Sequence, residues 1–492
     1  MSIIAAFMVP HPPLIIPAVG QGREEEVRET IDSYLAVAEE IAKARPETII
    51  ISSPHATMYS DYFHISPGYT AKGNFGDFGA RQVSFDVKYD VSLRERICQL
   101  AEEADFPAGI LGERKPALDH GTMVPLYFIL KKYTDFKLIR IGLSGLGLAD
   151  HYRLGEMIRQ AVEESGRRVV YVASGDLSHK LQDYGPYGFA PEGPEYDQRI
   201  MDTAGRGAFD EMLRFDENFC DRAAECGHRS FVMMAGALDG VSVSTRVYSH
   251  QDVTGVGYGI CSFYPGEKDP GRHFREAYLR EQEEKARSGM ESADAYVRLA
   301  RASLESYILR RETIHVPEGL PPEMYRNRAG AFVSIHKEGR LRGCIGTILP
   351  TEESVAMEII QNAISASTRD PRFDPIRPEE LPLLEINVDV LGEPEDIDSP
   401  DQLDVKRYGV IVTRGRRRGL LLPDLEGVDT VEEQIDIAKR KAGIDEDEEV
   451  KLQRFEVIRH RSEDVDVPLM HETRTGYVNA MTREEWENVR KS

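Results

Sequence analysis

The chain has 492 residues, which is more than one ordinary hydrophobic core organises, so we expect at least two domains. It contains 61 basic and 84 acidic residues, and its formal net charge of −23 would repel a phosphate backbone, so nucleic-acid binding is not expected. No apolar run approaches the ~20 residues of a membrane span, and the apolar start lacks the basic region of a signal peptide.

The cysteines bear on the cellular compartment. There are five of them, an odd number, and no two are spaced as Cys-x-x-Cys. A disulfide framework or a zinc ribbon is therefore not indicated, and a reducing compartment fits this usage. Together with the missing membrane and secretion signals, this predicts a cytoplasmic protein.

Strand-like and helix-like segments alternate through residues 1–265. Predicted strands occupy residues 3–9, 48–52, 83–89, 137–142, 169–173, 242–248 and 255–263. Helical periodicity covers residues 23–44, 149–165 and 224–238. This alternation predicts an α/β domain with a largely parallel or mixed sheet flanked by helices.

The composition changes after Phe263. Residues 266–290 are rich in charge, and we interpret them as a charged linker, part of which is a solvated helix. Residues 291–492 have a different pattern, in which hairpins are interleaved with helices. Helices are predicted at 293–310, 355–367 and 430–442, a strand at 385–391, and hairpins within 331–348 and 409–422. This pattern predicts a C-terminal α+β domain.

Polar side chains follow three of the predicted strands in the first domain. His11, His55, and the pair Asp176 and His179 each come directly after a short apolar run. In open α/β sheets, sites form outside the carboxyl ends of the strands. The sequence therefore predicts that these side chains share one rim of the sheet. Each histidine alone would also suit a loop or capping position.

Two histidines and one carboxylate form the facial arrangement of non-haem Fe(II) oxygenases, which leaves neighbouring positions open for substrate and dioxygen. His11 and His55 are the expected nitrogen ligands. Glu225, at the start of the predicted helix 224–238, is the expected carboxylate. Two alternatives remain: an ion pair between Glu225 and Arg229, and Asp176 as the carboxylate ligand.

A histidine near the metal can act as an acid or base because it titrates near neutral pH. His179 is the first candidate, with Asp176 beside it. His120, in Asp119-His120-Gly121, is a candidate for holding a substrate oxygen, or else part of a helix cap. His228 and His250 are weaker candidates for the site. His64 and His151 are expected at the surface.

Taken together, these motifs resemble the class III extradiol ring-cleavage dioxygenases of the LigB type. The resemblance rests on His11-Pro-Pro, Ser53-Pro-His55, residues 118–121 and 174–179, and the region from Glu225 to Leu238. It implies Fe(II) held by His11, His55 and Glu225, with His179 as the acid–base residue. It also implies a small aromatic diol and dioxygen as substrates, and self-association of the chain.

The related Memo proteins share this fold, and one feature of the chain points to them. Cys226 neighbours Glu225, and a cysteine ligand would favour copper or zinc over iron. A Memo-like metal-binding or interaction protein without ring cleavage is therefore the alternative. A zinc hydrolase on the same scaffold is a third reading.

The second half resembles the AMMECR family. The resemblance rests on Leu341-Arg-Gly-Cys-Ile-Gly346, on residues 362–373 and on Leu421-Leu-Pro423. Cys344, in the hexapeptide, is expected to be a packed thiol, with a nucleophile as the alternative. The pairing of the two modules suggests a functional link to a radical-SAM protein. The arginines at 414 and 416–418 are expected to form a solvated hairpin tip.

Overall fold

The computed structural model describes residues 3–425 and 427–461, and this part of the chain divides into two compact units. The first unit contains residues 3–278 and the second contains residues 279–461. Within the described ranges, no helix combines the length and apolar character that a membrane crossing requires.

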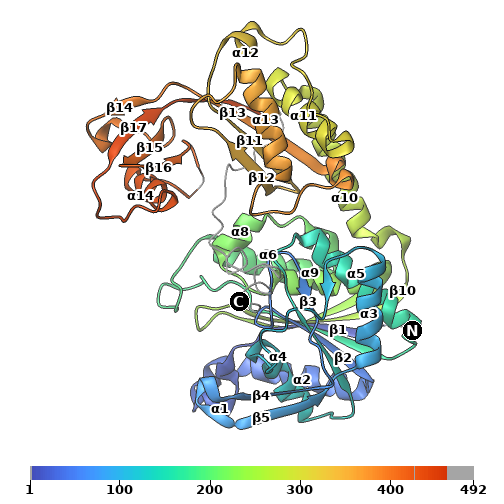
Figure 1. Ribbon diagram of the computed structural model, residues 1–492. Coiled ribbons are helices and arrows are strands. Elements are labelled where there is room, and N and C mark those ends of the chain that lie inside the picture. The colour runs from blue at the N-terminus through green and yellow to red at the C-terminus, as the bar shows by residue number, and fades with distance from the viewer. Residues whose placement is uncertain (1–2, 426, 462–492) are drawn as a thin grey trace. The chain divides into compact units, whose positions relative to one another are not determined.

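A six-stranded sheet forms the centre of the first unit (Figure 1), with the strand order β7-β2-β8-β1-β10-β9. Its strands are β1 (Ile3–Val9), β2 (Thr48–Ser53), β7 (Lys137–Gly142), β8 (Val169–Ser174), β9 (Val241–Gln251) and β10 (Tyr258–Lys268). The strands β7, β2, β8 and β1 run parallel, whereas β10 and β9 are antiparallel. Since β2, β8 and β1 are parallel neighbours, their carboxyl ends meet at one edge of the sheet.

Helices cover both faces of this sheet (Figure 1). On one face lie α2 (Arg28–Ala44) and α4 (His120–Leu130), and on the other lie α5 (Leu148–Ser165) and α9 (His228–Ala237). Every residue of β2 and β8 is buried, as expected for strands that are covered on both faces. The apolar runs in the sequence therefore mark the interior of the sheet.

The remaining elements of the first unit surround this layered core. They are the hairpin of β4 (Thr70–Phe75) and β5 (Ala80–Lys88), the strand pair β3 (Phe63–His64) and β6 (Ala108–Gly109), and the helices α1 (Pro17–Gly20), α3 (Val91–Glu103), α6 (Glu192–Arg206), α7 (Phe209–Leu213) and α8 (Glu217–Ala223).

The second unit contains two four-stranded antiparallel sheets with helices. The first sheet has the order β12-β11-β13-β18, from β11 (Ala331–Lys337), β12 (Arg340–Gly346), β13 (Leu384–Leu391) and β18 (Val457–His460). The second has the order β14-β17-β15-β16, from β14 (Glu395–Ile397), β15 (Gly409–Arg414), β16 (Arg417–Leu421) and β17 (Lys451–Phe455). The helices are α11 (Ala295–Arg310), α12 (Pro322–Arg326), α13 (Val355–Thr368) and α14 (Val431–Lys441).

The predicted fold class is confirmed in both units: a mostly parallel sheet with helices, followed by antiparallel sheets with helices. Three segments differ in detail. The predicted strand 83–89 is β5, which pairs with β4 outside the central sheet. The predicted helix 224–238 begins only at His228, after the separate helix α8. The segment 266–290 holds the end of β10 and most of α10 (Phe274–Ser292). Residues 462–492 of the predicted second domain lie outside the described ranges.

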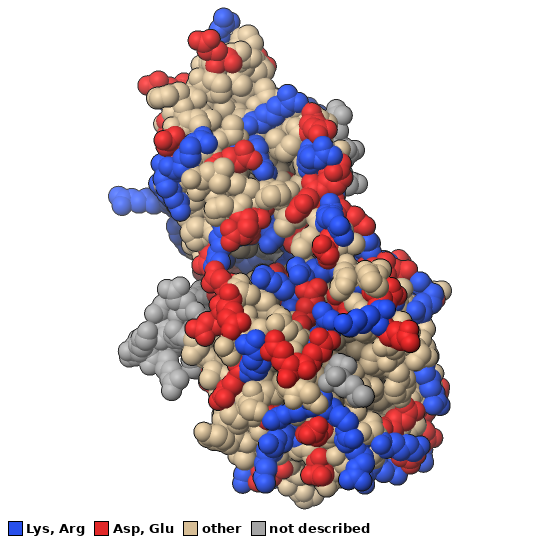
Figure 2. Space-filling model, turned by 90° about the vertical axis from the view of Figure 1, so that its right-hand side faces the viewer, with Lys and Arg blue, Asp and Glu red and all other residues tan. Residues whose placement is uncertain are grey.

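Charged side chains of both signs are interspersed over the face shown in Figure 2. Two arginines at the tip of the β15–β16 hairpin, Arg414 and Arg417, both form ion pairs with Glu448. An arginine that is already paired with a carboxylate is less available to a phosphate backbone. The absence of nucleic-acid binding remains a prediction.

Candidate metal centre

The carboxyl ends of β1, β2 and β8 deliver three polar residues to one edge of the sheet. His11, His55 and Asp176 each lie two residues after the last residue of their strand. Because β8 lies between β2 and β1, the chain leaves the sheet towards Asp176 between the points where it leaves towards His55 and His11. The shared rim predicted from the sequence is therefore present in the structure.

Cys226 joins these histidines from the loop between α8 and α9. His11, His55 and Cys226 each offer one ligand atom, and these atoms lie within 4.8 Å of one another. The two Nε2 atoms of His11 and His55 are 3.0 Å apart, and Cys226 Sγ is 3.6 Å from His11 Nε2. His11 is 1% exposed, so an ion held here would be largely removed from water.

Ser174, the last residue of β8, sets the tautomer of His11. Its hydroxyl donates to the carbonyl oxygen of Gly121 at 2.6 Å and also lies 3.0 Å from His11 Nδ1. A hydroxyl has one proton to donate, so towards His11 it must accept. Nδ1 of His11 therefore carries the proton, and Nε2 presents its lone pair to the cluster. A hydrogen bond of this kind to the outer ring nitrogen is typical of metal-ligating histidines.

The spacing of the three atoms fits one bound transition-metal ion. Two imidazole nitrogens bound at ~2.0–2.1 Å in neighbouring positions lie about 3.0–3.4 Å apart, and a thiolate bound at ~2.3 Å lies about 3.6 Å from such a nitrogen in tetrahedral geometry. The separations of 3.0 Å between the two Nε2 atoms and 3.6 Å between Cys226 Sγ and His11 Nε2 agree with these values. The donor set of two imidazoles and one thiolate suits borderline and soft ions.

The charge states of the ligands also suit a metal. Burial, followed by the nearby rings of His120 and His179, holds the pKa of His11 well below its ordinary value of 6.5. Burial lowers the pKa of His55 in the same way, followed by the charges of His11 and His120. Both rings are thus neutral at pH 7, the form that binds metal. Burial, with the charges of Asp176 and Glu225, raises the pKa of the Cys226 thiol, so a bound cation must displace its proton.

Asp176 and His179 form a second group with Cys226. One oxygen of Asp176, Oδ1, accepts the backbone N–H of His11 at 2.7 Å. The other, Oδ2, lies 3.9 Å from Nε2 of both His11 and His179. Burial lowers the pKa of His179, although Asp176 opposes this shift, and burial raises the pKa of Asp176. The Asp176 carboxylate therefore faces the His179 ring beside the candidate metal ligands.

The structure does not bring Glu225 into this cluster. Its carboxylate accepts the backbone N–H of His228 at 2.6 Å and so caps the start of α9. Burial raises the pKa of Glu225 to about 7. Arg229 forms an ion pair with Glu217. The sequence predicted Glu225 as the third ligand, with Cys226 as the alternative, and the structure directs Cys226, and not Glu225, towards His11.

A close approach of two loops fixes the direction of Cys226. A Cβ atom at Gly175 would lie 2.0 Å from the Cα of Gly227, so only glycine lets the two segments touch. The backbone N–H of Asp176 donates to Cys226 Sγ at 3.3 Å. Ala224 ends α8 in the left-handed conformation, with φ of 53°, which turns the chain into this loop.

His120 lies at the rim of the cluster as the first residue of α4. Its ring centroid is 4.0 Å from that of His55 and 5.4 Å from that of His11. Asp119 caps the helix by accepting the Thr122 N–H at 3.0 Å, so the helix-cap alternative for this segment applies to Asp119. Burial lowers the pKa of His120, which leaves a neutral ring able to hold a substrate oxygen.

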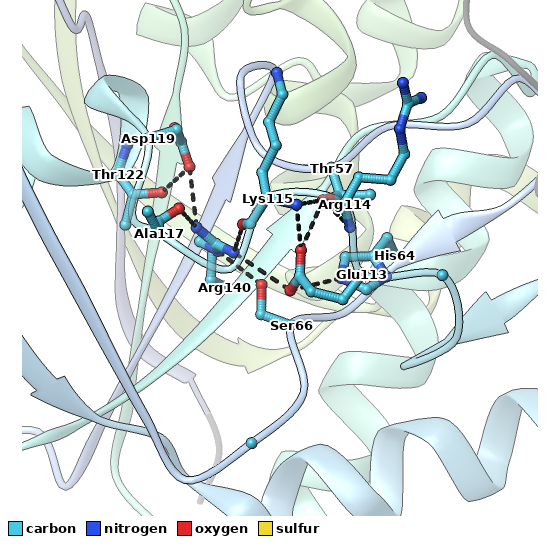
Figure 3. A network of polar contacts seen from close by, with 12 residues as sticks. Thr57, His64, Ser66, Glu113, Arg114, Lys115, Ala117, Asp119, Thr122 and Arg140 are labelled. Atoms are coloured by element: carbon cyan, nitrogen blue, oxygen red, sulfur yellow. Dashed lines mark hydrogen bonds and ion pairs between the residues drawn. The ribbon is translucent and has the colours of Figure 1, made fainter. Parts of the chain in front are cut away.

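A buried polar network supports this side of the site (Figure 3). Arg140, in the middle of β7, is fully buried and donates at 2.7 Å to Ser66 Oγ and to the carbonyl oxygens of Ala117 and Lys115. It also lies 3.6 Å from Glu113 Oε2 and 3.7 Å from Asp119 Oδ2. Arg140 was not among the residues predicted for the site, although an arginine within the apolar run 137–142 is a signal in the sequence.

The other candidate histidines have structural partners. His64 was expected at the surface but is buried, 3.2 Å from Glu113 Oε2, and His151 is likewise buried and bonds to the Gly147 carbonyl oxygen. His228 lies between Tyr196 and the Met212 carbonyl oxygen, and His250 pairs with Asp197 at 2.7 Å. The prediction that His64 and His151 lie at the surface was wrong, because polar partners inside the fold compensate for the burial of their rings.

In the second unit, Cys344 is buried on β12. Its thiol accepts a hydrogen bond from Ser334 Oγ at 3.2 Å, and its backbone N–H donates to Asp370 at 2.8 Å. Burial raises the pKa of this thiol above its usual range. These contacts agree with the expected packed thiol.

Comparison with known proteins identifies both halves of the chain. Residues 5–261 match a family model described as the catalytic LigB subunit of aromatic ring-opening dioxygenase, and residues 297–462 match the AMMECR1 model. Protein CA_C1420 of Clostridium acetobutylicum is 40% identical over 469 residues, covering 94% of this chain and all of that protein. A protein of Thermotoga maritima is 53% identical over 168 residues, covering 34% of this chain and 97% of its own length.

Two solved structures of uncharacterized proteins are also similar. PH0010 of Pyrococcus horikoshii is 34% identical, with 34% of this chain and 90% of that chain covered and a TM-score of 0.32. JW3007 of Escherichia coli is 14% identical, with 53% of this chain and 99% of that chain covered and a TM-score of 0.36. From the family models and the full-length relative, the chain belongs to the LigB family through residues 5–261 and carries an AMMECR1 domain at residues 297–462.

Proposed function

We propose that the LigB domain holds one transition-metal ion through His11 Nε2, His55 Nε2 and Cys226 Sγ and oxidises a small aromatic diol with dioxygen. The observation that carries the proposal is the spacing of these three atoms, with Asp176 and His179 directly beside them. Iron is the metal expected for ring opening in this family, and copper and zinc are the alternatives that a thiolate ligand favours.

The roles of the surrounding residues follow from their charge states. The metal, when bound, would orient the diol and supply the redox chemistry. His179 is neutral at pH 7, so it can accept the proton of a substrate hydroxyl and return it later in the reaction. Asp176 Oδ2, 3.9 Å from His179 Nε2, stabilises the imidazolium that forms. His120 would hold a substrate oxygen from the opposite side.

A second candidate function is metal binding without ring cleavage. It is favoured by Cys226, because a thiolate occupies the place that the carboxylate has in Fe(II) oxygenases with two histidine ligands. In this case the ion would serve storage, transfer or stabilisation of the fold. Both candidates require the same three ligands and differ in whether oxygen is consumed.

The ligand set is tested by metal titration of the full chain under anaerobic conditions. We expect Cys226→Ser to weaken binding of Fe(II), Cu(I) or Zn(II) at least about tenfold, because the donor atom itself is changed. Glu225→Gln should bind as the wild type does, and Cys98→Ser, which changes a thiol on α3, is the matched control. Loss of metal in Glu225→Gln together with full binding in Cys226→Ser would contradict the assignment.

The reaction is tested by oxygen uptake. The Fe(II)-loaded protein is mixed with a panel of catechols, and ring opening is followed by the absorbance of the product. His179→Gln should lower the rate at least about a hundredfold while metal content stays unchanged. Absence of uptake with every diol, at full iron content, would leave metal binding as the function. Ester hydrolysis by the Zn(II) form without oxygen would instead indicate a hydrolase.

A further inference from the structure

The strand β13 of the second unit is polar on one face, yet this face is buried. Its residues alternate between polar and apolar, which is typical of a strand with one face in water. The apolar residues belong to one hydrophobic cluster with residues of α11 and α13. The polar residues Glu385 and Asn387 lie on the opposite face, but they are only 5% and 2% exposed. The sequence thus gives this face a pattern suited to water, and the fold closes it off.

Two neighbouring strands contribute polar residues to the same face. In the antiparallel register, Ser334 of β11 lies opposite Asn387, and His336 lies opposite Glu385. On the other side of β11, Ser334 also lies opposite Cys344 of β12. Residues directly opposite each other in a sheet point to the same face. These five residues form a continuous group across three strands, which we call the polar patch.

Buried charges at the polar patch have partners. Asp389, the next polar residue along β13, accepts a hydrogen bond from Arg459 Nε of β18 at 2.9 Å. One oxygen of Glu385, Oε1, lies 3.4 Å from Lys285 Nζ of α10. These contacts follow the general rule that buried polar groups are paired or hydrogen-bonded.

Two buried atoms of the polar patch depart from this rule. Among the described residues, neither Glu385 Oε2 nor Asn387 Nδ2 has a hydrogen-bond partner. A buried polar group without a partner destabilises the folded state, so native proteins contain few of them. Here one atom is an acceptor and the other a donor, and they belong to residues two positions apart on one face of a strand. This pairing points to a ligand that supplies both missing partners.

The spacing of the two side chains suits a carboxamide group. Residues two positions apart on a strand are separated by about 6.6–6.8 Å. The oxygen and nitrogen of an amide are about 2.2 Å apart, and a hydrogen bond of about 2.9 Å at each end lets the group reach across about 8 Å at most. A carboxylate does not fit in the same way, because it has no N–H for Glu385 and carries the same charge.

Charged side chains border the polar patch where it meets the surface. Lys285, beside Glu385, is exposed. Arg372, which is also exposed, donates to the carbonyl oxygen of Cys344 at 3.2 Å. Both side chains have long stems with many rotamers. Access from this side therefore requires movement of side chains and leaves the hydrophobic core in place.

We propose that the polar patch of the AMMECR1 domain binds the carboxamide group of a small molecule. Asn387 Nδ2 donates to the amide oxygen, and Glu385 Oε2 accepts from the amide nitrogen. Ser334, His336 and Cys344 line the same site. All of these residues lie in the second unit, so the proposal is independent of the metal centre and of the reaction proposed for it.

The test compares matched amides and acids on the full chain by calorimetry at pH 7. The pairs are benzamide and benzoate, nicotinamide and nicotinate, and glutamine and glutamate. We expect at least one amide to bind at least about tenfold more tightly than its acid, because the acid lacks the N–H and is repelled by Glu385. Glu385→Gln, which removes the charge and offers an N–H of its own, should abolish this preference.

The matched control is Glu305→Gln, because Glu305 on α11 is an ion-paired glutamate of the same unit and should leave the preference unchanged. The proposal is overturned if no amide binds, if amides and acids bind equally, or if Glu385→Gln keeps the preference of the wild type. Tighter binding of benzylamine than of benzamide would also overturn it, since an amine offers Asn387 no acceptor.

Stability gives a second measurement that needs no ligand. Asn387→Leu removes an unpaired amide of similar volume, so the urea midpoint of the second unit, followed by hydrogen exchange in β13, should rise while amide binding is lost. Asn362 on α13 is the matched control, since it is also buried but its Nδ2 donates to the Ala331 carbonyl oxygen at 2.9 Å. Asn362→Leu should lower the midpoint. A lower midpoint in Asn387→Leu would show that a buried water satisfies this amide and would overturn the proposal.

Discussion

Single side chains decide the chemistry of the centre, and Ser174 shows this most clearly. Because its one proton goes to the Gly121 carbonyl oxygen, it fixes which nitrogen of His11 faces the cluster. Asp176 performs two tasks with its two oxygens, holding the His11 backbone and facing His179. Cys226 and Glu225 are neighbours in sequence, yet one contacts His11 and the other caps α9.

The role of Ser174 can be tested directly. Ser174→Ala removes the acceptor of the His11 Nδ1 proton and lets the ring adopt either tautomer. We expect metal affinity to fall about 10- to 100-fold, as for other outer-shell partners of metal ligands. Ser52→Ala is the matched control, because Ser52 is also buried near a strand end but faces Ser230 at 2.6 Å. Equal metal affinity of Ser174→Ala and the wild type would show that the tautomer is fixed in another way.

At the scale of elements, three parallel strands and two loops build the site. The strands β2, β8 and β1 place His55, Asp176 and His11 two residues beyond their ends, and the loop after α8, which touches Gly175 through Gly227, brings in Cys226. On the side of β7, Arg140 ties the loop before α4 to the sheet through Glu113, Asp119 and two carbonyl oxygens. The site is therefore rigid because several elements share its bonds.

Removal of the buried cation tests this view of the elements. Arg140→Met leaves Glu113 and Asp119 without their common partner, and we expect the free energy of unfolding of the first unit to fall by about 3–5 kcal/mol. Arg96→Met is the control, because Arg96 forms a surface ion pair with Glu164 and should change this free energy by only about 0–1 kcal/mol. Urea denaturation followed by circular dichroism gives both values. A loss of less than 1 kcal/mol in Arg140→Met would show that the network does not hold the loop.

At the scale of the whole molecule, the chain is two compact units with separate cores, and the candidate metal ligands all lie in the first. A metal bound only by the folded first unit stabilises that unit by mass action. Self-association and a functional link to a radical-SAM protein remain predictions at this scale.

Hydrogen exchange with mass spectrometry tests the location of the metal. At a free metal concentration of 100 times the Kd, we expect added protection worth about 2.7 kcal/mol in β1, β2 and β8. The strands β11, β12 and β13 of the second unit serve as an internal control and should not change. The Cys226→Ser variant at the same metal concentration should show little protection. Metal-dependent protection confined to the second unit would place the ion elsewhere.

Local sequence patterns were enough to predict much of the fold of this protein. The apolar runs gave β1, β2, β7 and β8 nearly to the residue, because a strand buried on both faces must be continuously apolar. Strand ends then located His11 and His55, since a residue just beyond a parallel strand lies at the rim whatever the details of the fold. The hairpins β11–β12 and β15–β16 of the second unit followed from its turn signals, and β13 followed from its alternating pattern.

The remaining features, above all which side chains face the candidate site, were decided only by the tertiary structure. Whether Glu225 or Cys226 faces His11 depends on how two loops distant in sequence touch at Gly175 and Gly227, and no local pattern records that contact. The tautomer of His11 and the buried position of His64 depend in the same way on partners far along the chain. The sequence predicted a candidate metal site at this rim, and the packing of loops brought Cys226, and not Glu225, to it, because side-chain direction is set by long-range contacts.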